Sequence, residues 1–562
     1  MRTKILGICN DETSSVCLLE NGILKAAVSE ERFSRKKLDN SFPTMSIDYV
    51  LDATNTKIKE IDCVSYAWFK GLQTDVLQKY LKRSYNSNYL TKTILNRVNW
   101  EVERDSKKRN EINSWIENHI NPNKIHFEDF YHHEAHASSA SFFSPFSDGI
   151  VMTCDARGDF ESLSIWEFDR KKKFPLKKIY SCTSLDSLGF FYGRITGLLG
   201  FKPMRHEGKV TGLAALGDPK KALPLMKKMI KVTNGEIISF PGKYYKPFFK
   251  PYDKGLINEI LSFDKKDIAA AAQAHLEQCL TKILNYHLKK IDKKSVNLML
   301  AGGVFSNVKV NQALKELALV KNIFVQPQMG DGGLCLGAAA LSANKRNINI
   351  DNPKNVYLGP SPNTIFNKNM SKKFKISKKK NLSKSILKDL LKNQVVGLIF
   401  GRMEFGPRAL CNRSILYKTS DIKINDWLNK RLNRNEFMPF APIIREEVAN
   451  VVFKKFDKTD QSLRFMTSTI NCKKIFLEKS PAVCHVDKTT RPQIIRKKEN
   501  PMIWELLKNW EKNTGEFALV NTSFNTHEEP IVCDTEDGLK NLEKGTVDCL
   551  YVNEYKILRL KQ

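Results

Sequence analysis

Short apolar runs that end in turn-forming residues recur along the chain. The run KILGIC near the N-terminus is followed by SSVCLLENG, whose Asn21-Gly22 pair is a strong signal for a two-residue hairpin turn. Two further apolar runs, IVMTCDARGD from Ile150 and NLMLAGGVFSN from Asn297, lead into glycine-containing turns. We therefore predict buried strands at these places.

Helical periodicity follows several of the predicted strands. The clearest example is AAAAQAHLEQCLTKILNYHLKKI, which starts at Ala269. Strands that alternate with helices are typical of an α/β fold. A later strand, QVVGLIF, opens a second α/β unit, and no internal repeat is visible in the sequence.

A change in composition divides the chain. Residues 352–388 contain no acidic residue, many lysines and three prolines. Such a segment is typical of a linker. A chain of 562 residues is long enough for two to four domains. We predict a first domain at 1–355, a basic linker at 356–388 and a second domain at 389–562.

The composition favours a cytoplasmic protein. No stretch approaches the roughly 20 apolar residues that span a bilayer, and the start, MRTKILGICND, lacks the features of a signal peptide. The twelve cysteines form no CxxC pair and are interpreted as reduced thiols. We expect no membrane partner, and the oligomeric state stays open, with a homodimer as one candidate.

The net charge of +30 is unusual. One explanation is the codon bias of an AT-rich genome, which enriches lysine, asparagine and isoleucine. The other is a polyanionic partner, because a strongly basic protein binds nucleic acid more tightly and meets it faster. Charge alone does not decide between the two explanations.

Residues 70–125 are candidates for such a contact. Basic and aromatic residues are interleaved there, and they include Lys79, Lys82, Arg83, Lys92, Arg97, Arg104, Lys107, Lys108 and Arg109 with Tyr80, Tyr85, Tyr89, Trp100 and Trp115. Basic groups contact phosphates while aromatic rings stack on bases. The alternative is an amphipathic helix pair whose aromatic residues face the core.

Three of the ten histidines lie in the stretch YHHEAH. On a helix, His132 and His136 share one face with Cβ atoms about 5–6 Å apart, which suits a shared metal ion. A helix with surface histidines fits the spacing equally well, so a third ligand is needed. Asp155 and Asp331 each follow a predicted strand and are candidates. His133 points elsewhere and is a candidate proton acceptor.

Two other groups of residues suit anionic ligands. The glycine-rich stretches LAGGVFSNVKVNQAL and QMGDGGLCLGAAA let a backbone approach a phosphate, although neither is a Walker A or Rossmann motif. In the second unit, arginines crowd near turns in GRMEFGPRALCNRS, before NEFMPFAP and in HVDKTTRPQ. Clustered arginines suit phosphate or carbamoyl oxygens. The alternative is structural pairing with Glu404, Glu436 and Asp487.

The chain resembles the NodU/CmcH-type O-carbamoyltransferases over nearly its whole length. The resemblance rests on a series of stretches in one order, which are SEERFSRKKLDNSFP, HHEAHASSA, EGKVTGLAALGDP, AGGVFSNVKVN, GDGGLCLGAA, GRMEFGPRALCNRSI, NEFMPFAP, PAVCHVDKTTRPQ and NTSFNTHEEPIV. It implies an actin/hexokinase-like (ASKHA) N-terminal domain and a YrdC-like C-terminal domain. In that family, carbamoyl phosphate and ATP give carbamoyl-adenylate and pyrophosphate, and the carbamoyl group then moves to a hydroxyl.

The resemblance also implies roles for residues. A metal, usually iron, is carried over to His132, His136 and Asp331, with Asp155 beside it. The catalytic candidates are His133, Arg408, Arg413, Arg434, His485, Arg491 and Ser523. The candidates that bind ATP or carbamoyl phosphate are Glu207, Lys209, Gly302, Gly303, Asn307, Asn311, Gly332, Gly333, Asn521 and Asn525. Mg²⁺ is a further candidate ion.

The sequence departs from the family pattern in two places. The first loop, residues 9–15, lacks the histidine that usually follows the opening strand, which puts the usual acceptor contacts in doubt. Cys411 stands where the family usually has glycine, and we expect it to adjust a turn.

The net charge is the basis for predicting which hydroxyl accepts the carbamoyl group. Because the small-molecule acceptors of the family do not require a charge of +30, we predict a hydroxymethylated base in nucleic acid, such as 5-hydroxymethylcytosine in DNA. Such a base has to be single-stranded or flipped out of the duplex. The alternatives are a small-molecule or saccharide hydroxyl, threonylcarbamoylation of tRNA, and a nucleic-acid-binding protein that has lost catalysis.

Overall fold

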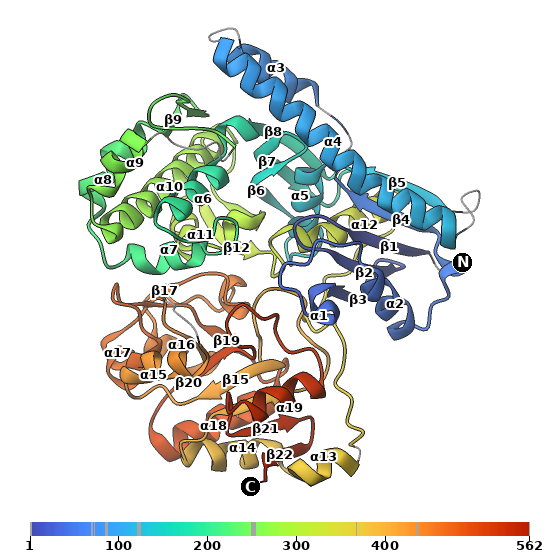
Figure 1. Cartoon of the computed structure of the whole chain (residues 1–562), viewed down its shortest axis with the longest axis vertical. Helices are drawn as coiled ribbons and strands as arrows, with labels where there is room; N and C mark the ends of the chain where they lie inside the picture. The colour runs from blue at the N-terminus through green and yellow to red at the C-terminus, as the bar shows by residue number, and fades with distance from the viewer. Residues whose placement is uncertain are drawn as a thin grey trace.

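The computed structural model describes residues 3–68, 71, 73–84, 88–120, 125–248, 254–366, 368–433 and 437–560. Two five-stranded sheets form the N-terminal half, and one eight-stranded sheet forms the C-terminal half. The two halves lie one above the other in Figure 1.

The first sheet has the order β3-β2-β1-β4-β5. Its strands are β1 (Lys4–Cys9), β2 (Ser15–Glu20), β3 (Ile23–Ser29), β4 (Cys63–Ala67) and β5 (His126–Phe130). β1, β2 and β3 are antiparallel, whereas β4 and β5 run parallel to β1. The predicted hairpin is confirmed, since Asn21 and Gly22 have φ of 49° and 79°, as a type I′ turn requires.

The second sheet repeats this layout with the order β12-β11-β6-β7-β8. Its strands are β6 (Asp148–Gly158), β7 (Glu161–Asp169), β8 (Leu176–Thr183), β11 (Val296–Ala301) and β12 (Val320–Val325). The first three are antiparallel, and β11 and β12 run parallel to β6. The duplicated layout agrees with the actin/hexokinase-like fold. The sequence shows no repeat because topology depends on the order of elements and not on residue identity.

Two helices fill the space between these sheets. α12 (Leu334–Lys345) packs on β1 and β4, α5 (His132–Phe142) packs on β6 and β11, and the two helices pack on each other. Gly337 makes this approach possible, because a Cβ at that position would lie 1.9 Å from the carbonyl oxygen of Ala135. The close crossing brings the start of α5 near the start of α12.

The opposite face of the second sheet is covered by α6 (Leu188–Leu198), α7 (Glu207–Ala214), α8 (Pro219–Lys227), α10 (Lys265–Leu288) and α11 (Val308–Lys315). α10 confirms the helix predicted from Ala269. α7 and α11 lie toward the C-terminal half in Figure 1.

The C-terminal sheet has the order β13-β22-β21-β14-β15-β20-β16-β19. Its strands are β13 (Phe374–Lys378), β14 (Val396–Ile399), β15 (Arg413–Tyr417), β16 (Ala441–Arg445), β19 (Gln493–Ile495), β20 (Ala518–Ser523), β21 (Cys549–Val552) and β22 (Tyr555–Arg559). α14 (Leu382–Leu391) and α18 (Pro501–Thr514) pack into one apolar cluster. α15 (Lys423–Arg431), α16 (Glu446–Val452) and α19 (Thr535–Glu543) pack into another. The predicted second α/β unit is confirmed.

The structure corrects the extent of the predicted linker at 356–388. Residues 374–378 form β13, which pairs with β22, and α14 begins at Leu382. Within the predicted linker, residues 356–366 run without a helix or strand, apart from an isolated bridge between Tyr357 and Glu404, and residues 368–373 form α13 (Lys368–Lys373). Lysines are common on edge strands, where they discourage pairing with another chain, so the lysine-rich sequence resembled a linker.

A helical arm runs along the edge of the N-terminal half (Figure 1). It consists of α3 (Thr74–Ser84) and α4 (Asn88–His119), within the predicted segment 70–125. Ile112, Trp115 and Ile116 near the end of α4 pack into the core of the first sheet. Although α4 has 32 residues, neither it nor another helix in the described ranges is apolar enough to cross a membrane.

Candidate active site

His132 and His136 lie one turn apart on α5, and both side chains are fully buried. The backbone N–H of His132 donates to Asp159 Oδ2 at 2.7 Å, which anchors the start of the helix. Gly158 lets the turn after β6 pass close by, because a Cβ there would lie 2.1 Å from the His132 ring.

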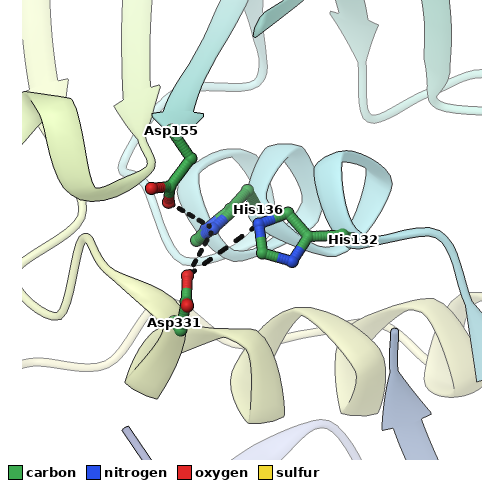
Figure 2. A group of neighbouring side chains, drawn as sticks. All are labelled: His132, His136, Asp155 and Asp331. Atoms are coloured by element: carbon green, nitrogen blue, oxygen red, sulfur yellow. Dashed lines mark ion pairs between the residues drawn. The ribbon is translucent and has the colours of Figure 1, made fainter. Parts of the chain in front are cut away.

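Asp155 and Asp331 complete a cluster with these histidines (Figure 2). Asp155 lies on β6, and Asp331 begins the short turn before α12. His136 Nε2 lies 3.4 Å from Asp155 Oδ2 and 3.5 Å from Asp331 Oδ1. His132 Nε2 lies 3.9 Å from Asp331 Oδ1. The structure therefore brings together all four residues predicted as metal ligands.

The cluster has the properties of a metal site. Both ring nitrogens of His132 and His136, together with Asp331 Oδ1, are buried and have no hydrogen-bond partner among the described residues. Buried polar atoms normally have a partner. One ligand atom from each of the four residues lies within 4.8 Å of the others. Two imidazoles and two carboxylates suit a divalent first-row transition metal.

The charges in the cluster favour a cation at its centre. Burial would lower the pKa of His136, but the Asp155 and Asp331 carboxylates outweigh burial and raise that pKa to about 9. Burial also raises the pKa of Asp331 to about 7, and the nearby Asp155 carboxylate adds to this. Burial holds the pKa of His132 well below its usual value, so this ring is neutral and can offer a nitrogen lone pair to a metal ion.

His133 occupies a different environment from its neighbours. Its Nδ1 lies 2.7 Å from Thr153 Oγ1, and the side chain is fully buried. Burial, with a contribution from His136, lowers the pKa of His133 to about 3. The predicted role of His133 as a proton acceptor stays a prediction.

The glycine-rich turns pack against the residues of the cluster and hold them in place. Gly302 has φ of 109° and lies so close to β6 that a Cβ there would be 2.2 Å from the Cys154 carbonyl oxygen. The backbone N–H of Gly303 donates to Asp155 Oδ2 at 2.9 Å. The carbonyl of Gly332 accepts a bond from Ser15 Oγ at 2.7 Å, and Gly333 lies in the same turn as Asp331. Their predicted contacts with a cofactor stay predictions.

A pocket of about 180 Å³ lies between the two halves of the chain. Its charged and hydrogen-bonding side chains include two predicted residues, His485 and Arg491, and others that sequence reasoning did not select, which are Thr211, Gln273, Glu277, Lys309, Thr469, Asp487, Thr489 and Thr490. Its apolar wall consists of Ala214, Ala215, Pro219, Ala270, Ala274, Met438, Pro439, Phe440 and Val483. Lys309 lies in the stretch AGGVFSNVKVN, so the same motif contained the signal.

Four other predicted cofactor residues of the N-terminal half belong to α7 and α11, the helices that contribute Thr211 and Lys309 to the pocket. Asn307 caps α11 and donates to Gln273 Oε1 at 2.8 Å. Asn311 Nδ2 donates to the carbonyls of Phe305 and Thr467, both at 2.7 Å, and so links the two halves. Glu207 accepts the Met204 N–H at the start of α7, and Lys209 is buried on that helix.

The predicted arginines of the C-terminal half lie in different environments. Arg413 is fully buried and donates to the carbonyl oxygens of Phe400, Gly401, Asn412, Cys533 and Pro360. These contacts favour a structural role over the predicted binding of phosphate. Arg408 donates to the Ser306 carbonyl at 3.2 Å, across the boundary between the halves. Arg434 lies outside the described residues.

Three predicted polar residues lie on or after β20. Asn521 is buried and donates to Gln493 Oε1 at 2.8 Å. Ser523 ends β20 opposite Ser414, and Asn525 donates to the Glu529 carbonyl at 2.7 Å. Their predicted roles are untested. Cys411 has φ of 80°, which explains why glycine is expected at this turn.

The basic and aromatic segment at 70–125 does not present the predicted stacking surface in the part that is described. Tyr80 and Trp115 are buried. Arg83, Arg97, Arg104, Lys108 and Arg109 form ion pairs with acidic residues of the same chain. The ring of Trp100 is exposed, whereas Tyr85 and the side chain of Tyr89 lie outside the described residues. The helix-pair alternative accounts for most of this pattern.

Two family models match the chain. The carbamoyltransferase N-terminus matches residues 4–340, and the carbamoyltransferase C-terminus matches residues 387–559. The chain belongs to the carbamoyltransferase family. It is therefore a transferase, as the sequence motifs predicted.

Three relatives of this carbamoyltransferase match most of its length. An uncharacterized protein of Methanocaldococcus jannaschii is 32% identical over 99% of this chain and 100% of its own. Nodulation protein NolNO of Sinorhizobium fredii is 29% identical over 96% of this chain and 78% of its own. Nodulation protein NolO of Bradyrhizobium diazoefficiens is 31% identical, and the match covers 76% and 78% of the two chains. The resemblance seen in the motifs is thus confirmed.

The likeness of this carbamoyltransferase to the solved structure of HypF is weak. HypF from T. kodakarensis is 12% identical, and the match covers 62% of this chain and 49% of that chain with a TM-score of 0.32. That likeness is too low to show a shared fold.

Proposed function

We propose that this carbamoyltransferase is an ATP-dependent O-carbamoyltransferase that acts on a hydroxyl of a small molecule or saccharide. Carbamoyl phosphate and ATP react in the pocket between the halves, and the carbamoyl group is transferred at the cluster of two histidines and two aspartates. The pocket is the observation that supports this best, because side chains from both family domains line one cavity.

The pocket suits a nucleotide with its phosphates. Lys309, His485 and Arg491 supply nitrogen groups that can hydrogen-bond phosphoryl oxygens, and Lys309 and Arg491 also carry positive charge. Asp487 pairs with Lys309 at 2.9 Å and lies 3.5 Å from His485 Nδ1, which fixes both side chains. Small apolar side chains such as Ala270 and Ala274 line the pocket, and a purine ring can pack against them.

The proposed reaction balances in two stages. Carbamoyl phosphate first loses its phosphate to water, and a carbamate oxygen attacks the α-phosphorus of ATP while pyrophosphate leaves. The acceptor oxygen then attacks the carbamoyl carbon, its proton passes to a base, and AMP leaves. Positive side chains around the phosphates lower the barrier by stabilising the charge that develops on their oxygens.

The cluster fits a metal ion held by His132, His136, Asp155 and Asp331. Such an ion would supply Lewis acidity, and the family resemblance favours iron. The chain itself supplies rigidity, because α5, β6 and the start of α12 hold the four ligands. Mg²⁺ is the natural companion of ATP in the pocket.

A compact acceptor is favoured over nucleic acid. The basic side chains of the arm are largely paired within the chain, and the four cluster residues are nearly or fully buried. The family match gives no support to a nucleic-acid acceptor, and neither do the names of the relatives. The charge of +30 is then explained by the codon bias of an AT-rich genome and not by a polyanionic substrate.

One assay tests the proposal. The protein is loaded with Fe(II) and incubated with ATP, carbamoyl phosphate and a panel of sugars, glycosides, plain DNA and DNA that contains 5-hydroxymethylcytosine. We expect equal release of AMP, pyrophosphate and phosphate, and a mass increase of one carbamoyl group on a small acceptor. A carbamoyl adduct on the hydroxymethylated base alone would reverse the choice of acceptor. Absence of pyrophosphate release with every acceptor would refute the two-stage reaction.

A further inference from the structure

We propose that helix α4 positions the metal site: Asp105 holds Trp68, and Trp68 fixes the ring of His132. The proposal rests on the metal centre that forms part of the proposed function. It assigns a role to the arm that sequence reasoning associated with nucleic acid.

The ring of His132 lacks the usual means of orientation. A histidine that binds a metal normally donates its other N–H to a carboxylate, a carbonyl or water, and this bond fixes the ring. Neither ring nitrogen of His132 has a hydrogen-bond partner in the part of the chain that is described. The orientation of this ring therefore depends on packing.

Trp68 supplies that packing. The centroids of the Trp68 and His132 rings lie 4.2 Å apart with an interplanar angle of 78°, which is an edge-to-face contact. Trp68 is fully buried directly after β4. Its φ is 150°, a conformation that large side chains rarely adopt, so surrounding contacts must hold it in place.

Asp105 of α4 provides the hydrogen bond that holds Trp68. The indole N–H donates to Asp105 Oδ2 at 3.1 Å, and the Asp105 side chain is only 1% exposed. Arg104 donates to Asp105 Oδ1 at 3.0 Å, and Arg157 approaches Oδ2 at 3.4 Å. The carboxylate is thus held on both oxygens.

The same network reaches two other parts of the active-site face. Arg157 lies on β6, two residues after Asp155, and its guanidinium lies 5.3 Å from the centre of the Trp68 ring. Arg104 also binds both carboxylate oxygens of Asp11 in the loop after β1. Asp105 is therefore a positioning residue that acts through Trp68, and α4 joins the first loop to the ligands.

Co(II) binding tests the proposal, with visible absorption bands as the readout. We expect Trp68→Leu and Asp105→Ala each to weaken Co(II) binding about 10–100-fold. Trp68→Phe, which keeps a ring against His132, should lose less. The double variant Trp68→Leu/Asp105→Ala should bind Co(II) as Trp68→Leu does, because Asp105 acts through Trp68. Glu103→Ala, an exposed position on the same helix, should leave binding unchanged.

Three results would overturn the proposal: unchanged Co(II) affinity in the single variants, additive losses in the double variant, or no Co(II) binding by the unaltered protein. If Trp68→Leu unfolds, as a melting curve would show, Trp68→Phe and Asp105→Ala decide. Carbamoyl phosphate-dependent exchange of pyrophosphate into ATP is measured on the same samples. Its absence from the unaltered protein would refute the proposed function and leave the Co(II) comparison intact.

Discussion

His136 is the residue that both carboxylates of the cluster approach, at 3.4 and 3.5 Å. We predict that His136→Ala lowers metal content to a small fraction of that of the unaltered protein. Carbamoyl transfer should fall by about 100-fold or more, since even outer residues of metal sites cost 10–100-fold. Metal analysis and product mass provide the measurement, with His287→Gln, a half-buried histidine outside the cluster, as control. Full metal content with full transfer would contradict the assignment.

Lys309 permits an equally direct test of the pocket. Removing one donor that stabilises developing negative charge typically costs about 10²–10³-fold. We therefore expect Lys309→Met to slow carbamoyl phosphate-dependent pyrophosphate exchange in that range. Lys315 lies on the same helix and pairs with Asp460, but it does not line the pocket. Lys315→Met is therefore the matched control. Equal loss in both variants would indicate a defect in domain contact and not in binding.

Part of the candidate site could be predicted from residue types and their spacing in the sequence. The spacing of His132 and His136 is readable in sequence, and so is the position of Asp331 after a strand, because both follow from helix and sheet geometry. Asp155 was expected after a strand but lies on β6 itself. Arg413 shows the limit, since a guanidinium that binds phosphate and one that binds carbonyls look alike in sequence. The link from Asp105 through Trp68 to His132 joins three segments far apart in the chain, and periodicity carries no information about it.

At the scale of elements, the crossing of α5 and α12 controls the cluster, because His132 and His136 lie in the first turns of α5 and Asp331 lies in the turn just before α12. A Cβ at Gly337 would lie 1.9 Å from the Ala135 carbonyl, so Gly337→Ala must push the helices apart. We expect a loss of about 1–3 kcal/mol in the free energy of unfolding and weaker metal binding. Gly208→Ala on α7, where a Cβ would meet nothing within 4 Å, should be neutral or slightly stabilising. Urea unfolding of the two variants gives the comparison.

Elements were predicted well where the local pattern is strong and poorly where the environment decides. The hairpin at Asn21-Gly22 and helix α10 follow from turn chemistry and periodicity. β13 was missed because the lysines of an edge strand and those of a linker have the same composition. The aromatic residues of α3 and α4 could face a partner or the core, and only packing shows that Tyr80 and Trp115 are buried.

At the scale of the whole molecule, the ion pair between Lys309 and Asp487 joins the two halves. Burial would raise the pKa of Asp487, but the bond from His485 and the charge of Lys309 outweigh burial and hold that pKa well below its usual value. Because the pKa is lower in the folded chain, ionised Asp487 stabilises the fold at neutral pH, and this contribution is lost as pH falls below about 4.

We therefore expect Asp487→Asn to lower stability by about 1 kcal/mol at pH 7, and the difference from the unaltered protein should shrink toward pH 3. The urea midpoints of both proteins at pH 7, 5 and 3.5 provide the measurement. A difference of the same size at every pH would show that the ionised form of Asp487 contributes nothing.

The pocket between the halves has walls from residues 211–309 and from residues 438–491 of one chain. Neither half can enclose this space alone, so the two halves cannot be inherited, exchanged or expressed as independent enzymes without rebuilding the cavity at their boundary. A carbamoyl-adenylate made there would lie between side chains of both halves. Two inactive variants mixed in one tube, one damaged in each half, would accordingly fail to rescue one another.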